Sequence, residues 1–223
     1  MAGATFTYYS PEEILAIFKE QHRLCAPLDP MADPTYMIEH DSPVDLWRAS
    51  GDMLDWDYLV DFLNQEFRVS IPLRDWKTAM LPEHKKTVWD VCLLLSKHAQ
   101  KPDFQPVKRF GQDCLSAGVF LTLMKNLKSK GVDVSELRPS SLIEPYLDKH
   151  FSPMLEEITL TGVQVLDKLE LGPPTSERRF VHWLDRFIPR FVFHHSIDTG
   201  GIVTFRDLVE KILENQPLSK PQA

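Results

Sequence analysis

Apolar residues recur along much of this chain at three- and four-residue steps, which is the period of an amphipathic helix. The pattern is clearest between residues 54 and 67, where its members are Leu54, Tyr58, Leu59, Phe62, Leu63 and Phe67. A second strongly apolar run follows Thr87 and leads toward His98. Both segments are predicted to be helices, and the fold class is predicted to be mainly α.

Two short sequences mark where helices begin. Ser10, Pro11 and Glu13 fit a capped first turn, so the first helix is predicted to start at Pro11. Thr87 is placed to cap the next clear helix, with the carboxylate of Asp90 in its first turn.

The second half of the chain is also predicted to be mostly helical. A long helix is expected from about Val107 to Lys130, ended by Gly131 in a left-handed conformation. Residues 138–151 predict a turn and a short helix, whereas residues 154–170 suit either a helix or a strand, and we favour the helix. The remaining expected elements are a helix opening near Ser176 and Glu177, a short β-hairpin around residues 197–201, and a final helix from Thr204 to about Glu214.

Two prolines and polar residues after Lys101 give the best domain boundary. We therefore expect an N-terminal helix and linker in residues 1–40, a helical bundle in residues 41–101 and a second, mostly helical domain in residues 107–215. Residues 216–223 are expected to form a disordered tail.

Charge and cysteine content exclude several kinds of function. The formal net charge of −7 argues against a nucleic-acid partner, which would require clustered lysine and arginine. Cys25, Cys92 and Cys114 are odd in number and far apart, so neither a disulfide framework nor a structural zinc site is predicted. Cys114 is interpreted as a small buried hydrophobe of the long helix. No apolar run is long enough for a transmembrane segment, and a cytoplasmic location is expected.

Residues 41–101 resemble the acyl carrier protein family. In that family an Asp-Ser-Leu motif begins an acidic helix, which ends in Glu-Phe and is followed by a short element ending in proline and by a helix that opens with Thr-Val-x-Asp. The matching residues, in the same order, are Asp52-Met53-Leu54, Glu66-Phe67, Ile71-Pro72, Thr87-Val88 and Asp90. The resemblance implies a carrier-like helical bundle over this part of the chain.

Met53 stands where the family has its attachment serine. A thioether provides no hydroxyl oxygen for the phosphodiester to 4′-phosphopantetheine, so the domain is a degenerate carrier, and neither covalent phosphopantetheine nor another cofactor is expected. Ser50 is an alternative attachment point three residues earlier, but the helix start would then be misplaced.

The carrier-like segment is strongly acidic. Residues 41–67 contain seven acids and one base, Arg48, which gives a local charge of −6. Carrier proteins dock such a helix on basic patches of partner enzymes, so the resemblance implies a protein partner with a basic patch. The candidate partner-binding residues are Asp52, Met53, Asp55, Asp57, Asp61 and Glu66. The alternative is that the aspartates only solvate the exposed face of the helix.

The histidines and arginines near the C-terminus form a second candidate region. His194 and His195 would point to opposite faces of a strand, so no metal site is predicted. Arginine and aromatic residues alternate between residues 178 and 193, which suits a mostly buried helix, with a membrane surface, nucleotides or an apolar partner as alternative contacts.

The leading hypothesis is a non-catalytic protein-interaction or ligand-binding protein built on the degenerate carrier domain. The alternative is an enzyme of lipid or acyl metabolism with its site in the C-terminal domain. Its candidate residues are Arg178, Arg179, His182, His194 and His195.

Overall fold

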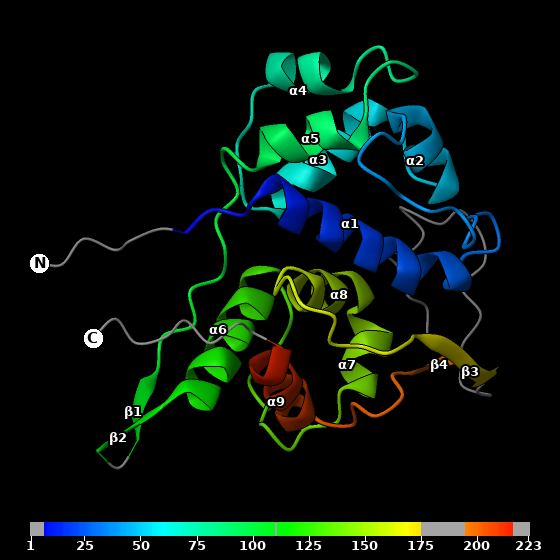
Figure 1. Cartoon of the computed structure of the whole chain (residues 1–223). Helices are drawn as coiled ribbons and strands as arrows, with labels where there is room; N and C mark the ends of the chain where they lie inside the picture. Colours follow the sequence, from blue (N-terminus) through cyan, green and yellow to red (C-terminus); the bar gives the residue numbers. More distant parts are fainter. Residues whose placement is uncertain (1–6, 110, 175–194, 216–223) are drawn as a thin grey trace, which may run out of the picture. The chain divides into compact units, whose positions relative to one another are not determined.

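The computed structural model describes residues 7–109, 111–174 and 195–215, and the described chain is mainly helical (Figure 1). It divides into two compact units. The first consists of residues 1–101 and 168–198, and the second of residues 102–167 and 199–223. The break after Lys101 lies where the sequence places a boundary, but the second unit is not the continuous stretch 107–215 that the sequence predicts.

The first unit contains six helices and one β ribbon among its described residues. Its elements are α1 (Pro11–Cys25), η1 (Ala26–Leu28), α2 (Val44–Ser50), α3 (Trp56–Glu66), α4 (Leu73–Met80), α5 (Val88–Leu95), β3 (Glu170–Pro174) and β4 (His195–Asp198). Helix α5 packs against both α1 and α4. Residues 1–40 therefore belong to the same compact unit as residues 41–101.

The capped helix starts are confirmed at both predicted positions. The Ser10 hydroxyl accepts the Glu13 N–H at 3.3 Å, and the Glu13 carboxylate accepts the Ser10 N–H at 2.8 Å. Thr87 and Asp90 form the same reciprocal pair at the start of α5, so Asp90 completes a capping box as well as favouring the helix dipole. Each pair satisfies backbone donors that the first turn of a helix leaves free.

The apolar stripes of the first unit meet in an aromatic core. Trp47 of α2 and Trp76 of α4 are almost completely buried. The rings of Phe18 on α1 and Trp47 lie 4.9 Å apart between centroids, and Phe18 also contacts Phe67 edge-on at 6.0 Å. Helix α3 contributes Leu59 and Leu63 to this buried side. The predicted helix over residues 54–67 is thus confirmed with slightly shorter bounds.

Strand β4 does not form the predicted hairpin around residues 197–201. It pairs antiparallel with β3, with Glu170 opposite Asp198 and Leu171 opposite Ile197. Gly200 (φ +68°) lies in the turn after β4, and the chain from Thr199 onward belongs to the second unit.

The second unit begins with a β-hairpin. Its elements are β1 (Val107–Arg109), β2 (Gln112–Cys114), α6 (Leu115–Ser129), α7 (Glu144–Lys149), α8 (Phe151–Thr159) and α9 (Phe205–Asn215). Helices α8 and α9 both pack against α6, and α7 packs against α8. The prediction that one helix runs from Val107 is wrong at its start, because residues 107–109 pair with residues 112–114 as antiparallel strands. Gly131 (φ +82°) follows the end of α6 as predicted.

Other predicted elements end earlier than expected or lie outside the described residues. Residues 154–170 are helical only as far as Thr159, and Gly162 (φ +73°) follows in a turn. The helix expected near Ser176 and Glu177, the aromatic segment 178–193 and the tail 216–223 lie outside the described residues. Within the described part of the chain, no helix has the length and apolar character needed to cross a bilayer.

Candidate functional site

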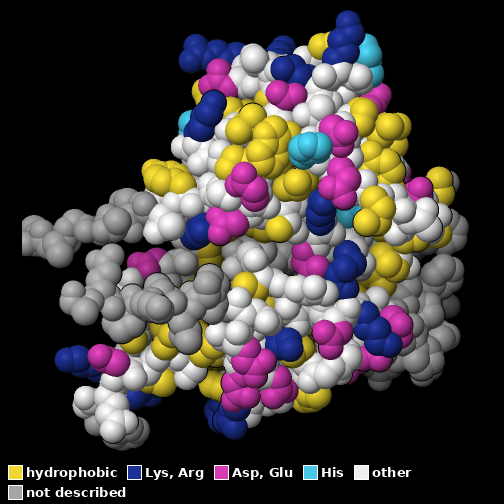
Figure 2. Space-filling view, viewed as in Figure 1, with side chains coloured by type: hydrophobic (Ala, Val, Ile, Leu, Met, Phe, Trp, Pro, Cys, Tyr) yellow, Lys and Arg dark blue, Asp and Glu magenta, His cyan; other side chains and the backbone are white. Residues whose placement is uncertain are grey.

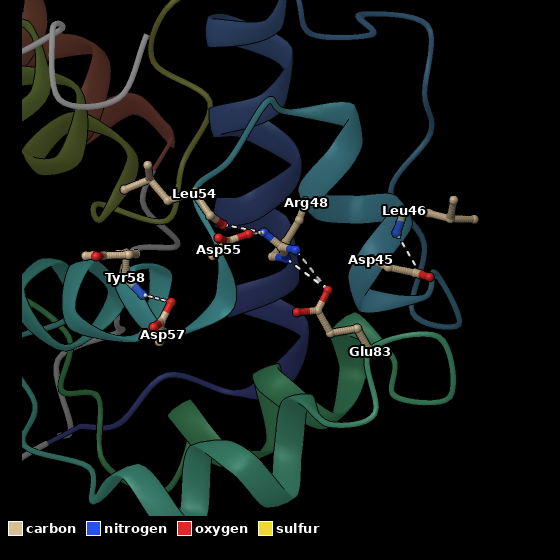
Figure 3. Close-up of polar contacts among 8 residues, drawn as sticks. All are labelled: Asp45, Leu46, Arg48, Leu54, Asp55, Asp57, Tyr58 and Glu83. Atoms are coloured by element: carbon tan, nitrogen blue, oxygen red, sulfur yellow. Dashed lines mark hydrogen bonds and ion pairs between the residues drawn. The ribbon is translucent and has the colours of Figure 1, made fainter. Parts of the chain in front are cut away.

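The loop between α2 and α3 is held by one arginine (Figure 3). The Nε and Nη2 atoms of Arg48 donate to Oε2 of Glu83 at 3.1 and 3.0 Å, and Nη1 donates to the carbonyl oxygen of Leu54. The Arg48 and Glu83 side chains are only 16% and 17% exposed. This contact ties the loop before α3 to the loop between α4 and α5.

Met53 lies inside this tied loop and not on a helix. Its backbone N–H donates to the carbonyl oxygen of Arg48 at 2.9 Å, directly after Asp52 in a left-handed conformation (φ +46°). Its side chain lies against Gly51, where an added Cβ would come within 2.9 Å of the methyl carbon of Met53. Helix α3 begins three residues later, at Trp56.

Ser50 offers no attachment point in this structure. It is buried, and its hydroxyl donates to the carbonyl oxygen of Trp47 at 2.8 Å. The oxygen therefore faces into the first unit, where an incoming group cannot reach it.

The aspartates around α3 are mostly exposed. The Asp55 side chain is 83% exposed, and Asp57 and Asp61 are also exposed on α3, one helical turn apart. Asp45 belongs to α2, and its carboxylate accepts the N–H of Leu46 at 2.8 Å (Figure 3). Among the described residues, no lysine or arginine forms an ion pair with Asp57 or Asp61.

Asp52 and Glu66 are less exposed than the other acidic candidates for partner binding. Asp52 is partly buried, and burial, with a smaller contribution from the nearby Asp29 carboxylate, raises its pKa. Glu66 is only 1% exposed, and the Gln21 amide donates a hydrogen bond to its carboxylate. Glu66 therefore belongs to the interior of the first unit and cannot contribute to the exposed acidic surface, in contrast to its place among the candidate partner-binding residues.

We define the α3 acidic face as Asp55, Asp57 and Asp61 together with the exposed ring of Tyr58. Tyr58 is 64% exposed, although the helical pattern of the sequence includes it among the apolar residues. Asp57 and Asp61 repel each other at this spacing, which costs the helix a few tenths of a kcal/mol. The Asp55 carboxylate lies 3.8 Å from Nη1 of Arg48, so the charge of the face that no described lysine or arginine pairs with is that of Asp57 and Asp61, beside one large aromatic side chain.

The first unit also has a basic region. Residues 74–101 contain six lysines and arginines and three acids, a balance of +3, against −6 for residues 41–67. Figure 2 shows dark blue Lys and Arg side chains gathered along the α4 edge of the first unit. The unit is therefore electrically polar, with the α3 acidic face as its negative part.

The histidine and arginine candidates are not brought together in the described structure. Arg178, Arg179, His182 and His194 lie outside the described residues, and His195 is described only as the first residue of β4, opposite Pro174. Within the described ranges, no group of three or more His, Cys, Asp or Glu side chains is arranged to hold a metal ion.

Cys114 is not the buried helical cysteine that the sequence predicts. It ends β2 and directly precedes α6, and it is partly exposed. Its Sγ lies 3.3 Å from Oγ of Ser116, and hydrogen bonds from that hydroxyl and from the amide of Ala117 lower the pKa of the thiol. A cysteine at a strand-to-helix junction is a feature that the apolar pattern around residue 114 conceals.

Compared with known proteins, the chain matches no family model, no curated protein and no solved structure.

Proposed function

We propose that this chain is a non-catalytic interaction protein whose α3 acidic face docks on a basic surface of a partner protein. The observation that carries the proposal is that α3 holds Asp57 and Asp61 exposed and without a basic partner among the described residues. If these aspartates served only to keep the helix face hydrated, lysines three or four residues away would stabilise the helix by pairing with them. Retained negative charge instead favours encounter with a positive partner.

The structural support for docking is the rigidity of the segment that leads into α3. Arg48 fixes the loop from both sides, and the buried residues Leu59 and Leu63 fix the helix behind its exposed face. A surface that is already ordered loses little conformational entropy on binding. The acyl-carrier resemblance agrees with this reading, because that family docks through an acidic helix that follows the attachment loop.

In this proposal the side chain of Met53 packs within the loop and takes part in no chemistry. Its side chain covers Gly51 and provides no nucleophile. The first unit would then present a carrier-like surface without carrying a group at that position.

A binding measurement with a phosphopantetheinyl transferase tests the proposal, because that enzyme class receives acidic carrier helices. The full chain is expected to associate with it at a rate that falls with rising salt, and Asp57→Asn with Asp61→Asn is expected to reduce the rate about tenfold.

Glu210→Gln with Glu214→Gln is the matched control. These two acids are also exposed and one turn apart, but on α9 of the second unit. Equal effects of the two double variants would mean that only net charge matters, and that result would refute docking through the α3 acidic face.

A further inference from the structure

The α3 acidic face adjoins a basic stretch of the neighbouring helix α4. Nζ of Lys77 on α4 lies 5.9 Å from the centroid of the Trp56 ring, at the first residue of α3 and directly before Asp57. The indole N–H of Trp76 donates to Oδ1 of Asn64 at 3.3 Å, which ties α4 to the second half of α3. The two helices therefore present their exposed side chains from one fixed arrangement.

The exposed side of α4 carries two cations and one apolar side chain. Arg74 and Lys77 are exposed and lie three residues apart, and Leu73 beside them is 49% exposed. Within the described part of the chain, Lys77 forms no ion pair, and the one ion pair of Arg74 is with the adjacent Asp75. We define the α4 basic face as Leu73, Arg74 and Lys77.

The α3 acidic face and the α4 basic face complement each other. Each has two like charges at helical spacing and one exposed apolar or aromatic side chain, Tyr58 on α3 and Leu73 on α4. Among the described residues, no ion pair joins the acids of α3 to the bases of α4 in the same chain. These charges are therefore available to another molecule, and a contact between the two kinds of face would also cover Tyr58 and Leu73.

We propose that the first unit binds a second copy of this chain, with the α3 acidic face of each copy on the α4 basic face of the other. The inference rests on the proposed function, because it names the partner of the same acidic face. A surface that contains both the acids and the matching bases is self-complementary about a two-fold axis, so each contact forms twice. Pairing of opposite charges across the contact fixes the register of the two copies.

The net charge of the chain opposes this contact and thereby makes it testable. Each copy has a formal net charge of −7, so two copies repel each other as whole molecules. The acid-reversed variant, Asp57→Lys with Asp61→Lys, raises the net charge by four, from −7 to −3. Net charge alone would then favour self-association, whereas the loss of local pairing would weaken it. The two explanations therefore predict opposite results.

Sedimentation velocity over a concentration series measures the self-association of the full chain. Wild type is expected to dimerise below about 100 μM. The acid-reversed variant and the base-reversed variant, Arg74→Glu with Lys77→Glu, are each expected to raise the dissociation constant of the dimer at least about tenfold, because like charges then face each other. Glu210→Lys with Glu214→Lys makes the same change in charge on α9 of the second unit and is expected to leave the dimer unchanged.

A mixture of the two reversed variants distinguishes a specific contact from a folding defect. In the mixed pair, the new lysines of one copy face the new glutamates of the other, and the native bases face the native acids. The mixture is therefore expected to dimerise although each variant alone does so poorly, and this result requires both variants to be folded. If a reversed variant loses its helical circular dichroism, Asp57→Asn with Asp61→Asn replaces it and is also expected to weaken the dimer.

Three results would overturn the proposed contact: a wild-type chain that stays monomeric up to about 100 μM, a dimer that survives the substitutions on α3 and α4, or folded reversed variants that do not associate when mixed. The transferase measurement separates this inference from the proposed function. If wild type stays monomeric but Asp57→Asn with Asp61→Asn weakens transferase binding, the α3 acidic face docks on a partner other than a second copy. If wild type stays monomeric and transferase binding is unaffected, both proposals fail.

Discussion

Replacement of Arg48 by methionine tests how the loop before α3 is held. Methionine keeps most of the aliphatic length of arginine, so the packing of the buried stem changes little. The substitution removes the hydrogen bonds from the guanidinium to Glu83 and to the carbonyl oxygen of Leu54. Its effect therefore measures the polar contacts of Arg48 and not the bulk of the side chain.

The expected loss follows from burial. Removing one partner of a fully buried ion pair costs about 3–5 kcal/mol, because the other charge is left without a partner. Arg48 and Glu83 are 16% and 17% exposed, so water can offset part of this cost. We expect Arg48→Met to lower the free energy of unfolding of the first unit by about 2–3 kcal/mol.

Urea unfolding followed by tryptophan fluorescence measures this loss. Trp47, Trp56, Trp76 and Trp89 all lie in the first unit, so the signal reports on the unit that contains the substitution. A lower midpoint with an unchanged slope would show a loss of stability without a change in the surface exposed on unfolding.

Arg74→Met is the matched control. The Arg74 side chain is 84% exposed, and among the described residues its one ion pair is with the neighbouring Asp75 at 3.3 Å, so the expected loss is below about 0.5 kcal/mol. Equal effects at the two positions would refute the structural role assigned to Arg48. A double-mutant cycle with Glu83→Gln should give a coupling energy of about 1–2 kcal/mol.

Two further predictions concern the start of α6. Gly118→Ala should destabilise the second unit by about 1–3 kcal/mol in thermal unfolding followed by circular dichroism, because its Cβ would lie 1.9 Å from the carbonyl oxygen of Gln105; a stability gain from alanine's helix propensity alone would contradict this close approach. Iodoacetamide should alkylate Cys114 first as pH rises, since hydrogen bonds from Ser116 and Ala117 lower the pKa of its thiol, whereas burial raises the pKa of Cys92 to about 12. Faster labelling of Cys92 would show that the thiol environments are wrongly assigned.

Helix starts could be predicted from the sequence because the interactions that fix them are local. Ser10 with Glu13, and Thr87 with Asp90, complete their hydrogen bonds within four residues, so no distant part of the chain is needed. The spacing of apolar residues likewise predicted α3 and α5, because each is an amphipathic helix over its own length.

The start of α6 and the partner of β4 could not be predicted in the same way. Residues 107–109 pair with residues 112–114, and this pairing replaces the first turns of the helix that the apolar pattern predicts. Strand β4 pairs with a strand whose nearest paired residue, Pro174, precedes it by 21 positions. Pairing over such distances leaves little signal in a local pattern.

The burial of Glu66 could have been predicted from its helical spacing, although a count of charges does not reveal it. It lies three residues after Leu63 and seven after Leu59, which is the spacing of the buried stripe of α3. Asp57 lies two residues before Leu59 and Asp61 two residues after it, so both are off this stripe, and both are exposed. Helical phase therefore separates Glu66 from the other acids, although all belong to the same acidic run.

The isolated bridges Pro43–Thr87 and Leu142–Thr204 belong to one backbone arrangement that is repeated in the two units, and this repeat is hard to see in the sequence. Most of its hydrogen bonds join backbone N–H and C=O groups, which nearly any residue supplies, so the paired segments need not share side chains. The two units agree in identity at Ser42 and Ser141 and at the Thr-x-x-Asp of α5 and α9, where the side chain itself makes the bond. Each Thr-x-x-Asp by itself indicates only a capped helix start, whereas in the structure both belong to a backbone arrangement that is repeated in the two units.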